Sequence, residues 1–290
     1  MNTYSPVAAP AMPSPSASVP VKLRRDPLTG QYIPVPVNGA RSTLAQRLQA
    51  NALPLSTDVR YANPSDPLLQ LQSAQQSDDA FWQVHAETLW NRPLAQRQQD
   101  QRAYFARTIG AVESLLERSD IVDITIVEHH RQGRVISCLY GFSDATTRSQ
   151  VIQGEAQRWN RRTGGDLLAD VLTSELVDGS RILLNTEHWI AYIPYASTAP
   201  LEILVMPKQT SRSLAALSDA ARDNLAEVTH RLFSLLCQVA GAEASFTACW
   251  NMAPASACPH VSRLHLRVTA DAPLESSSPE ALAEQLRALS

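Results

Sequence analysis

The segment from Glu175 to Gln209, ELVDGSRILLNTEHWIAYIPYASTAPLEILVMPKQ, decides the fold. It contains three runs rich in β-branched, aromatic and other apolar residues, at 181–184, 189–194 and 201–206. Residues typical of turns, among them Asn, Pro, Ser and Thr, separate these runs. The segment therefore predicts three consecutive strands.

Helices and further strands are predicted on both sides of this segment. Apolar residues recur at helical spacing in four places: 93–117, 155–178 with a break at Gly164-Gly165, 217–239 and 279–289. Further β-rich runs lie at 32–37, 123–127, 134–140, 245–251 and 264–269. Residues 38–80 are rich in Gln, Ala and Ser and predict mostly loop, with one short helix at 42–50. Antiparallel strands combined with long crossing helices predict a mixed α/β or α+β fold.

The bulk composition excludes several classes of partner. The chain has 290 residues, of which 44% are hydrophobic and 18% charged, and its formal net charge is −3. A charge so close to zero does not favour nucleic acid or a membrane surface as a partner. No apolar run is long enough to span a membrane, and residues 1–20 lack the basic start and continuous apolar stretch of a secretory signal. We therefore expect a cytoplasmic protein that binds neither nucleic acid nor membranes.

Four segments, in this order, resemble the galactose-1-phosphate uridylyltransferase family, a branch of the histidine-triad-like superfamily. The first is RDPLTGQYIPV at Arg25–Val35, and the second is DPLLQLQSA at Asp66–Ala74. The third and most specific is the segment quoted above, which continues into a helix opened by Leu217-Ser218-Asp219. The fourth is the tail, SSPEALAEQLRALS at Ser277–Ser290. Together they span nearly the whole chain.

The resemblance implies a fold and a chemistry. The fold has two related halves with antiparallel sheets and crossing helices, usually assembled as a homodimer; we place the halves at 23–165 and 166–290, after a disordered Pro/Ala/Ser-rich tail at 1–22. The chemistry is transfer of a uridylyl group through a covalent uridylyl-histidine, formed by the second His of a His-Pro-His-Gly-Gln motif. An imidazole suits this step because it is nucleophilic near neutral pH and leaves readily once attached to phosphorus.

The chain lacks this histidine motif. The family places the motif between the 123–140 strands and the next helix, where Gly141–Ile152 here reads GFSDATTRSQVI and contains no His. Phe142, Ser143 and Asp144 stand at the His-Pro-His positions. Asp144 is a candidate acceptor for a nucleotidyl group, but an acyl phosphate breaks down by a different route. The sequence therefore predicts that the family's uridylyl transfer has been lost.

The metal sites that the resemblance implies are also incomplete. No cysteine precedes Cys138, so the family's N-terminal Cys-x-x-Cys zinc site is absent. A second family site uses a Glu and three histidines, two of them in a His-x-His. Here Glu155 stands for the Glu, His265 for one histidine, Arg267 for its partner and Asn251 for the third. No cofactor is predicted; zinc or iron is left open, with Glu155, His260 and His265 as the remaining candidate ligands.

Other polar residues have two interpretations each. His129 and His130, with His260 and His265, form either a new metal or acid–base site or ordinary turn and sheet positions. Arg41 and Arg158 are candidate contacts for an anionic ligand, as is Lys208, which follows a family Pro-Lys match. A solvated position is the alternative for each of these basic side chains.

Three functions remain open at this point. The favoured one is a repurposed binder of a nucleotide, a sugar phosphate or another small anion, without uridylyl transfer. The second is an enzyme with a different reaction in the same cleft, which would use His129, His130, His265 or Asp144. The third is a non-catalytic scaffold subunit. A fold alone does not decide between them.

Overall fold

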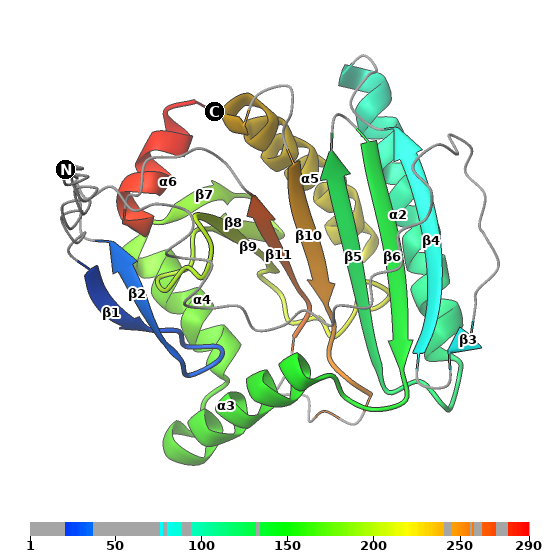
Figure 1. The fold of residues 1–290 in the computed structure, drawn as a ribbon, viewed down its shortest axis with the longest axis horizontal. Coiled ribbons are helices and arrows are strands. Elements are labelled where there is room, and N and C mark those ends of the chain that lie inside the picture. The colour runs from blue at the N-terminus through cyan, green and yellow to red at the C-terminus, as the bar shows by residue number, and fades with distance from the viewer. Residues whose placement is uncertain are drawn as a thin grey trace, which may run out of the picture.

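Figure 1 shows the fold in a computed structural model of the chain, which describes residues 21–36, 76–77, 80–88, 94–131, 134–240, 245–255, 257, 263–270 and 278–289. The fold is α+β, as predicted, and it is built on one nine-stranded sheet in the order β3-β4-β6-β5-β10-β11-β9-β8-β7. Every neighbouring pair of strands is antiparallel. The strands are β3 Gln76–Ser77, β4 Ala80–Thr88, β5 Asp123–Arg131, β6 Arg134–Phe142, β7 Ile182–Asn185, β8 Trp189–Tyr192, β9 Leu201–Pro207, β10 Ser245–Asn251 and β11 His265–Ala270.

Strand β10 joins the early and late parts of the chain. It pairs with β5 on one side, where Ser245 lies opposite Arg131 and Asn251 opposite Thr125. On its other side it pairs with β11, where Asn251 lies opposite His265. The hydrogen-bonded sheet therefore crosses the boundary that we placed at residue 165, and the division into halves remains a prediction.

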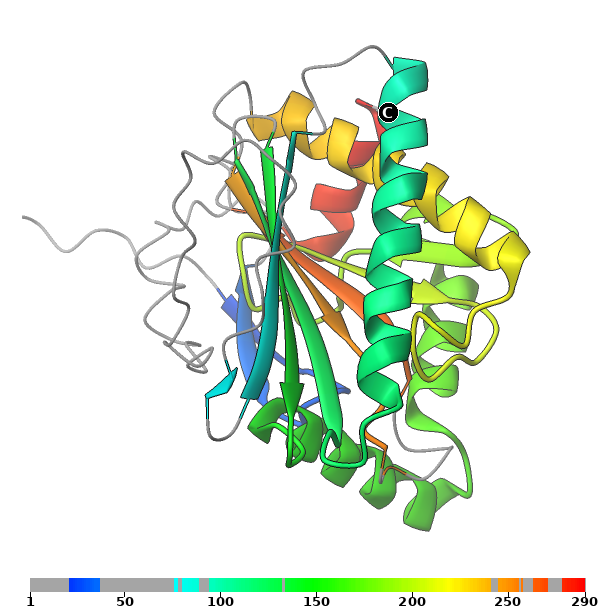
Figure 2. The same cartoon turned by 90° about the vertical axis from the view of Figure 1, so that its right-hand side faces the viewer.

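Two long helices cover one face of the sheet. Figure 2 shows α2 (Leu94–Leu116) and α5 (Asp219–Ala240) on the same side of the strands. The apolar stripe of α2 is buried there, and Phe105 contacts Trp250 of β10 edge to face, with ring centroids 6.1 Å apart. Trp189 of β8 contacts Trp250 in the same way at 6.3 Å. Alternation along each strand places these apolar side chains on one face of the sheet.

A buried carboxylate lies within this core. Glu128 of β5 accepts a hydrogen bond from Trp250 Nε1 at 3.1 Å, and its Oε1 lies 2.9 Å from the Tyr104 hydroxyl. Its other oxygen lies 2.9 Å from His130 Nε2. These partners satisfy polar atoms that would otherwise be costly to bury.

The opposite face is covered at its β7–β9 end. Helix α4 (Leu167–Asp178) and the hairpin of β1 (Val21–Arg25) and β2 (Tyr32–Pro36) lie there, and Leu28 and Leu168 pack on Ile190 and Met206. Helix α3 (Thr147–Thr163), which follows β6 and precedes α4 in the chain, runs across the lower end of the sheet in Figure 1. The hairpin turn is the predicted Asp-Pro-Leu-Thr-Gly, in which Gly30 has φ 71° and donates its N–H to the Asp26 carbonyl at 2.8 Å.

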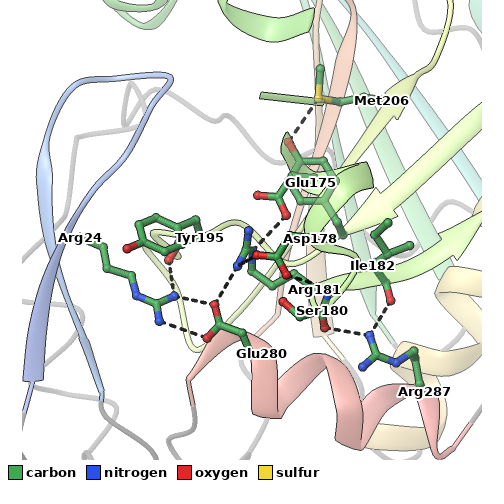
Figure 3. Close-up of polar contacts among 11 residues, drawn as sticks. Arg24, Glu175, Asp178, Ser180, Arg181, Ile182, Tyr195, Met206, Glu280 and Arg287 are labelled. Carbon is green, nitrogen blue, oxygen red and sulfur yellow. Dashed lines mark hydrogen bonds and ion pairs between the residues drawn. The ribbon is translucent and has the colours of Figure 1, made fainter. Parts of the chain in front are cut away.

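The C-terminal helix α6 (Pro279–Arg287) is fixed to the hairpin and to α4 by ion pairs, as Figure 3 shows. Glu280 accepts two hydrogen bonds from Arg24 of β1, at 3.0 and 3.1 Å, and a third from Arg181 at 2.9 Å. Arg181 is buried and also pairs with Glu175 of α4 at 3.0 Å. One carboxylate therefore connects three segments that are distant in sequence.

Most predicted elements are present, and the differences have local causes. The predicted break at Gly164-Gly165 separates α3 from α4, but α3 begins eight residues earlier than predicted because Thr146 caps it: Thr146 Oγ1 accepts the Ser149 N–H. β1 and β4 were not predicted, and β1 begins inside the tail that was predicted to be disordered. The helix predicted at 42–50 lies outside the described residues.

Candidate functional site

Alternate residues of β10 and β11 present polar side chains on the face opposite α2 and α5. Leu266, Val268 and Ala270 of β11 are in the main core, so His265 and Arg267 point to the other face. In the register of the two strands His265 lies opposite Asn251, and Arg267 opposite Cys249. This patch of polar residues is the starting point of the candidate site.

His265 is buried, with only 2% of its surface exposed, and its tautomer is fixed. Its Nδ1 lies 3.0 Å from the backbone carbonyl of Arg263. A carbonyl oxygen only accepts, so Nδ1 carries the proton and Nε2 carries a lone pair. Burial, followed by the positive charge of Arg148, lowers the pKa of His265 to about 4, so the ring is neutral at pH 7. Nε2 is buried without a hydrogen-bond partner in the described structure.

Arg267 is held in place by a buried carboxylate. Its Nε lies 2.7 Å from Glu202 Oε1, and its Nη2 donates to Thr198 Oγ1. Burial would raise the pKa of Glu202, but Arg267 and the hydrogen bonds from Thr198 outweigh burial and lower that pKa. The Arg267–Glu202 pair is therefore neutral as a unit.

Arg148 supplies a second guanidinium that has no such partner. It lies in the first turn of α3, and its Nε is buried with no hydrogen-bond partner among the described residues. Burial lowers its pKa, and the like charge of Arg267 lowers it further, yet an arginine stays protonated in proteins. The carboxylates within electrostatic range are Glu202, which already pairs with Arg267, and Asp26 of the hairpin turn. In the described structure Arg148 therefore forms no ion pair of its own.

The start of α3 is held by a carboxylate. Thr146 is fixed to β5, because its N–H and hydroxyl both donate to Asp123 Oδ2 at 2.9 Å. The first turn of α3 contains no acidic residue. A helix N-terminus carries partial positive charge and exposes backbone N–H groups to anions. Arg148, His265 and Arg267, which we call the Arg148 cluster, therefore combine two guanidinium groups with a buried imidazole.

The family's second metal site does not fit these residues. Arg267 has only N–H donors and a positive charge, so it repels a metal ion instead of ligating it. Glu155 is engaged elsewhere: it accepts from Arg25 Nη2 at 2.9 Å and from Arg158, and these contacts, the Arg158 bond first, lower its pKa. In the part of the chain that the structure describes, no three His, Cys, Asp or Glu side chains are close enough to hold a metal ion. His260, the other candidate ligand, lies outside that part.

Glu155 instead lines a separate shallow hollow beside the hairpin. Its wall consists of Arg25, Pro27, Glu155, Arg158, Trp159, Arg162 and Leu167. Arg162 lies over the Trp159 ring at 5.1 Å, and Glu155 offsets the charge of the two arginines that it binds. The predicted ligand contact Arg158 is therefore an ion-pair partner of Glu155 on a largely exposed helix face.

The other predicted site residues do not come together. His130 points into the core, stacked on Phe246 at 4.4 Å, whereas His129 lies on the opposite face, with Nδ1 3.3 Å from Thr247 Oγ1. Thr247 is four residues along β10 from Asn251, so His129 is about 13 Å along the sheet from the His265 position. The structure therefore does not bring His129, His130 and His265 together.

Asp144 and Lys208 have local explanations. Asp144 is exposed, in the bend between β6 and α3. Lys208 donates from Nζ to the Thr186 carbonyl, and its own N–H donates to the His188 carbonyl at 2.8 Å, so it fastens the end of β9 to the β7–β8 turn. Arg41 lies outside the described residues.

The structure adds a residue that the sequence did not single out. Arg148 belongs to Gly141–Ile152, the segment that carries no histidine. An arginine in the segment that stands at the position of the family's catalytic motif could have been named as a candidate site residue. The sequence could not show that it lies within electrostatic range of His265, which is 117 residues later in the chain and is brought near by the sheet order.

Parts of this chain are similar in sequence to known galactose-1-phosphate uridylyltransferases. The profile described as "Galactose-1-phosphate uridyl transferase, C-terminal domain" matches residues 153–271. The galactose-1-phosphate uridylyltransferase of Streptomyces lividans is 27% identical over 135 residues, which cover 46% of this chain and 37% of that enzyme. The enzyme of the same name from Haemophilus influenzae is 39% identical over 69 residues, 24% of this chain and 20% of that enzyme. The matched stretches are therefore well under half of those relatives' length.

Solved structures match over nearly the whole chain. A uridylyltransferase mutant superimposes with a TM-score of 0.65 at 18% identity, covering 92% of this chain and 98% of the other. An ADP-glucose phosphorylase from Arabidopsis thaliana with bound ADP-glucose gives a TM-score of 0.65 at 10% identity, covering 93% of this chain and 100% of the other. At such identities the likeness establishes the fold and leaves the activity open.

Proposed function

Because this chain is a divergent relative of the galactose-1-phosphate uridylyltransferases, we propose that it binds a phosphate-bearing small molecule at the Arg148 cluster and does not transfer a uridylyl group through a histidine of the family motif. The ligand class is a nucleotide or a sugar phosphate. The chain keeps the scaffold on which relatives carry out phosphate chemistry, while Gly141–Ile152 contains no imidazole to attack phosphorus.

A single observation carries the proposal. The Nε of Arg148 is buried and has no protein acceptor in the described structure, and its strongest charged neighbour is Arg267, which has the same sign. Native proteins satisfy almost all their buried polar groups, so an orphaned guanidinium N–H indicates a partner supplied from outside the chain. An anion fits this position, because Arg148 carries a positive charge and Arg267 is near enough to add to it.

Phosphate is the anion that fits this geometry best. A guanidinium binds two phosphate oxygens with parallel N–H donors, and the backbone N–H groups of a helix start bind a third. The neutral ring of His265 adds no charge that would oppose the anion.

The test compares ligand binding by the natural chain and by Arg148→Gln. Isothermal titration with UMP, galactose 1-phosphate, UDP-glucose and ADP-glucose should give saturable binding of at least one of them, and Arg148→Gln should weaken it about 10- to 100-fold because a charged hydrogen bond is lost. Arg161→Gln, an exposed position on the same helix, is the matched control and should bind as the natural chain does. Equal binding by Arg148→Gln and the natural chain would contradict the proposed site.

The loss of uridylyl transfer is tested separately. Incubation with UDP-glucose labelled in the uridylyl group should leave no acid-labile label on the protein. Label retained on any histidine would overturn this part of the proposal.

One observation favours the alternative of a different reaction. His265 carries a lone pair on Nε2 next to two cations, and this arrangement also suits a base or a nucleophile. Phosphorus NMR of each bound ligand over several hours would reveal turnover.

A scaffold role and the predicted homodimer are tested by sedimentation velocity of the purified chain, in which a dimer has twice the monomer mass.

A further inference from the structure

We propose that His265 selects the protonation state of the bound anion: the site takes a terminal phosphate that still carries a proton, and it rejects sulfate, phosphodiesters and fully deprotonated monoesters. This inference rests on the proposed anion site and specifies its ligand class. It favours a sugar phosphate or a nucleoside monophosphate over a nucleotide sugar, whose two phosphates carry no P–OH group near neutral pH.

The first step is the hydrogen-bonding character of Nε2. The Arg263 carbonyl, 3.0 Å from Nδ1, fixes the ring proton on that nitrogen. Nε2 is then an acceptor and cannot donate. It is also buried and lacks a partner in the described structure. A ligand atom that meets Nε2 must therefore bring its own hydrogen.

The second step is the set of charged and titratable groups around the ring. Arg148 comes from α3, Arg267 from β11 and Glu202 from β9, with Cys249 on β10 and Asp26 in the β1–β2 turn within range of the arginines. Burial raises the pKa of Cys249 and that of Asp26, and Glu202 is held by Arg267. Both arginines are partly exposed, whereas His265 is buried.

The third step is the chemistry of the anion. The two guanidinium groups attract unprotonated oxygens, whereas the lone pair on Nε2 repels them and accepts a hydrogen bond from P–OH. A phosphate monoester has its second pKa at about 6, so below that pH it offers one P–OH and above it none. Sulfate and a phosphodiester have no such proton in the physiological range. A site that pairs a buried acceptor with two cations distinguishes these anions, because the wrong one leaves a polar group unpaired.

The experiment titrates the natural chain with methyl phosphate, dimethyl phosphate and sulfate between pH 5.5 and 7.5. Methyl phosphate has no hydroxyl other than P–OH, so it isolates the predicted contact. Its affinity should exceed that of sulfate by about tenfold or more at pH 5.5 and should fall about tenfold per pH unit above about 6. Sulfate and dimethyl phosphate should bind weakly and with little pH dependence, and they control for titration of the protein itself.

Two variants separate the roles of the ring. His265→Leu removes the acceptor and should abolish the preference and the pH profile of methyl phosphate, while His265→Gln keeps an acceptor oxygen and should retain part of both. Equal affinity and equal pH profiles for methyl phosphate and sulfate in the natural chain would overturn this inference and leave the anion site standing. If none of the three anions binds at any pH, both the inference and the proposed function are wrong.

Discussion

Gly30 shows how a single residue supports the region near the site. Its φ of 71° is in the left-handed region, where glycine has no steric penalty. A β-carbon at this position would also collide with the Glu155 carboxylate, which Arg25 and Arg158 hold in place. The residue therefore combines a turn requirement with a close approach between the hairpin and α3.

Gly30→Ala should destabilise the protein by about 1 kcal/mol or more, because alanine is strained at positive φ and its methyl group displaces Glu155. Gly110→Ala is the matched control: Gly110 lies within α2 and a β-carbon there meets nothing within 4 Å. That change should stabilise the helix by about 0.5–1 kcal/mol. Urea unfolding of both variants measures the difference, and two shifts of the same sign would contradict the argument.

At the scale of elements, α6 depends on the ionisation of Glu280. Burial alone would raise the pKa of this carboxyl, but hydrogen bonds from Arg24 and Arg181 outweigh burial and lower the pKa to about 2 (Figure 3). The pKa in the folded chain is therefore below the unfolded value of about 4.3. Ionised Glu280 therefore adds its full share to the free energy of unfolding at pH values above the unfolded pKa. This share is lost as the pH falls towards the folded pKa.

Glu280→Gln should cost about 1–2 kcal/mol at pH 6, after allowance for the partial exposure of the side chain, and much less at pH 3. The free energy of unfolding, measured by urea titration at several pH values, should therefore converge for variant and natural chain as pH falls. Glu284→Gln, on the exposed side of α6, should show no such convergence. A constant difference from pH 6 to pH 3 would rule out the ionic anchor.

Elements with strong local signals were predictable from sequence. Ser278-Pro279 marks the start of α6 correctly, because a serine cap followed by proline is compatible with only one helical register. Strand β4 was missed because AFWQVHAET follows a polar, Gln-rich stretch without a clear turn, and its pairing with β6 is a tertiary contact. The start of α3 was placed too late because Thr146 is recognisable as a cap only when Asp123 is seen to hold it.

On the scale of the whole molecule, the sheet determines what unfolds together. Trp189 and Trp250 belong to one buried cluster, although strands on both sides of residue 165 contribute to it. A shared core and a continuous ladder of hydrogen bonds couple the two predicted halves. The chain should therefore unfold in a single transition.

Urea unfolding followed by tryptophan fluorescence and by far-ultraviolet circular dichroism should give coincident curves. The two signals report, respectively, the packing around the buried indoles and the overall helix and strand content. Separated midpoints would show that the halves unfold independently and would support the division at residue 165.

The site was predictable only in part. Sequence comparison placed His265 and Arg267 correctly on one strand and showed that the histidine motif is missing. It could not show that His130 points into the core while His129 faces the other way, since adjacent residues of a strand differ only in face. Nor could it show that Arg148 is within electrostatic range of His265, because that proximity arises from the sheet order and from the path of α3.

The position of β10 determines whether the two fragments stay together after proteolytic cleavage between α3 and α4. The loop at Gly164-Gly165 joins α3 to α4, and Gly164 is exposed, so a protease site placed there would be accessible. The fragment after the cut contains β10, whose seven residues remain hydrogen-bonded to β5 in the fragment before it. The nicked protein should stay assembled as a two-piece complex, and the two pieces expressed separately should reconstitute it.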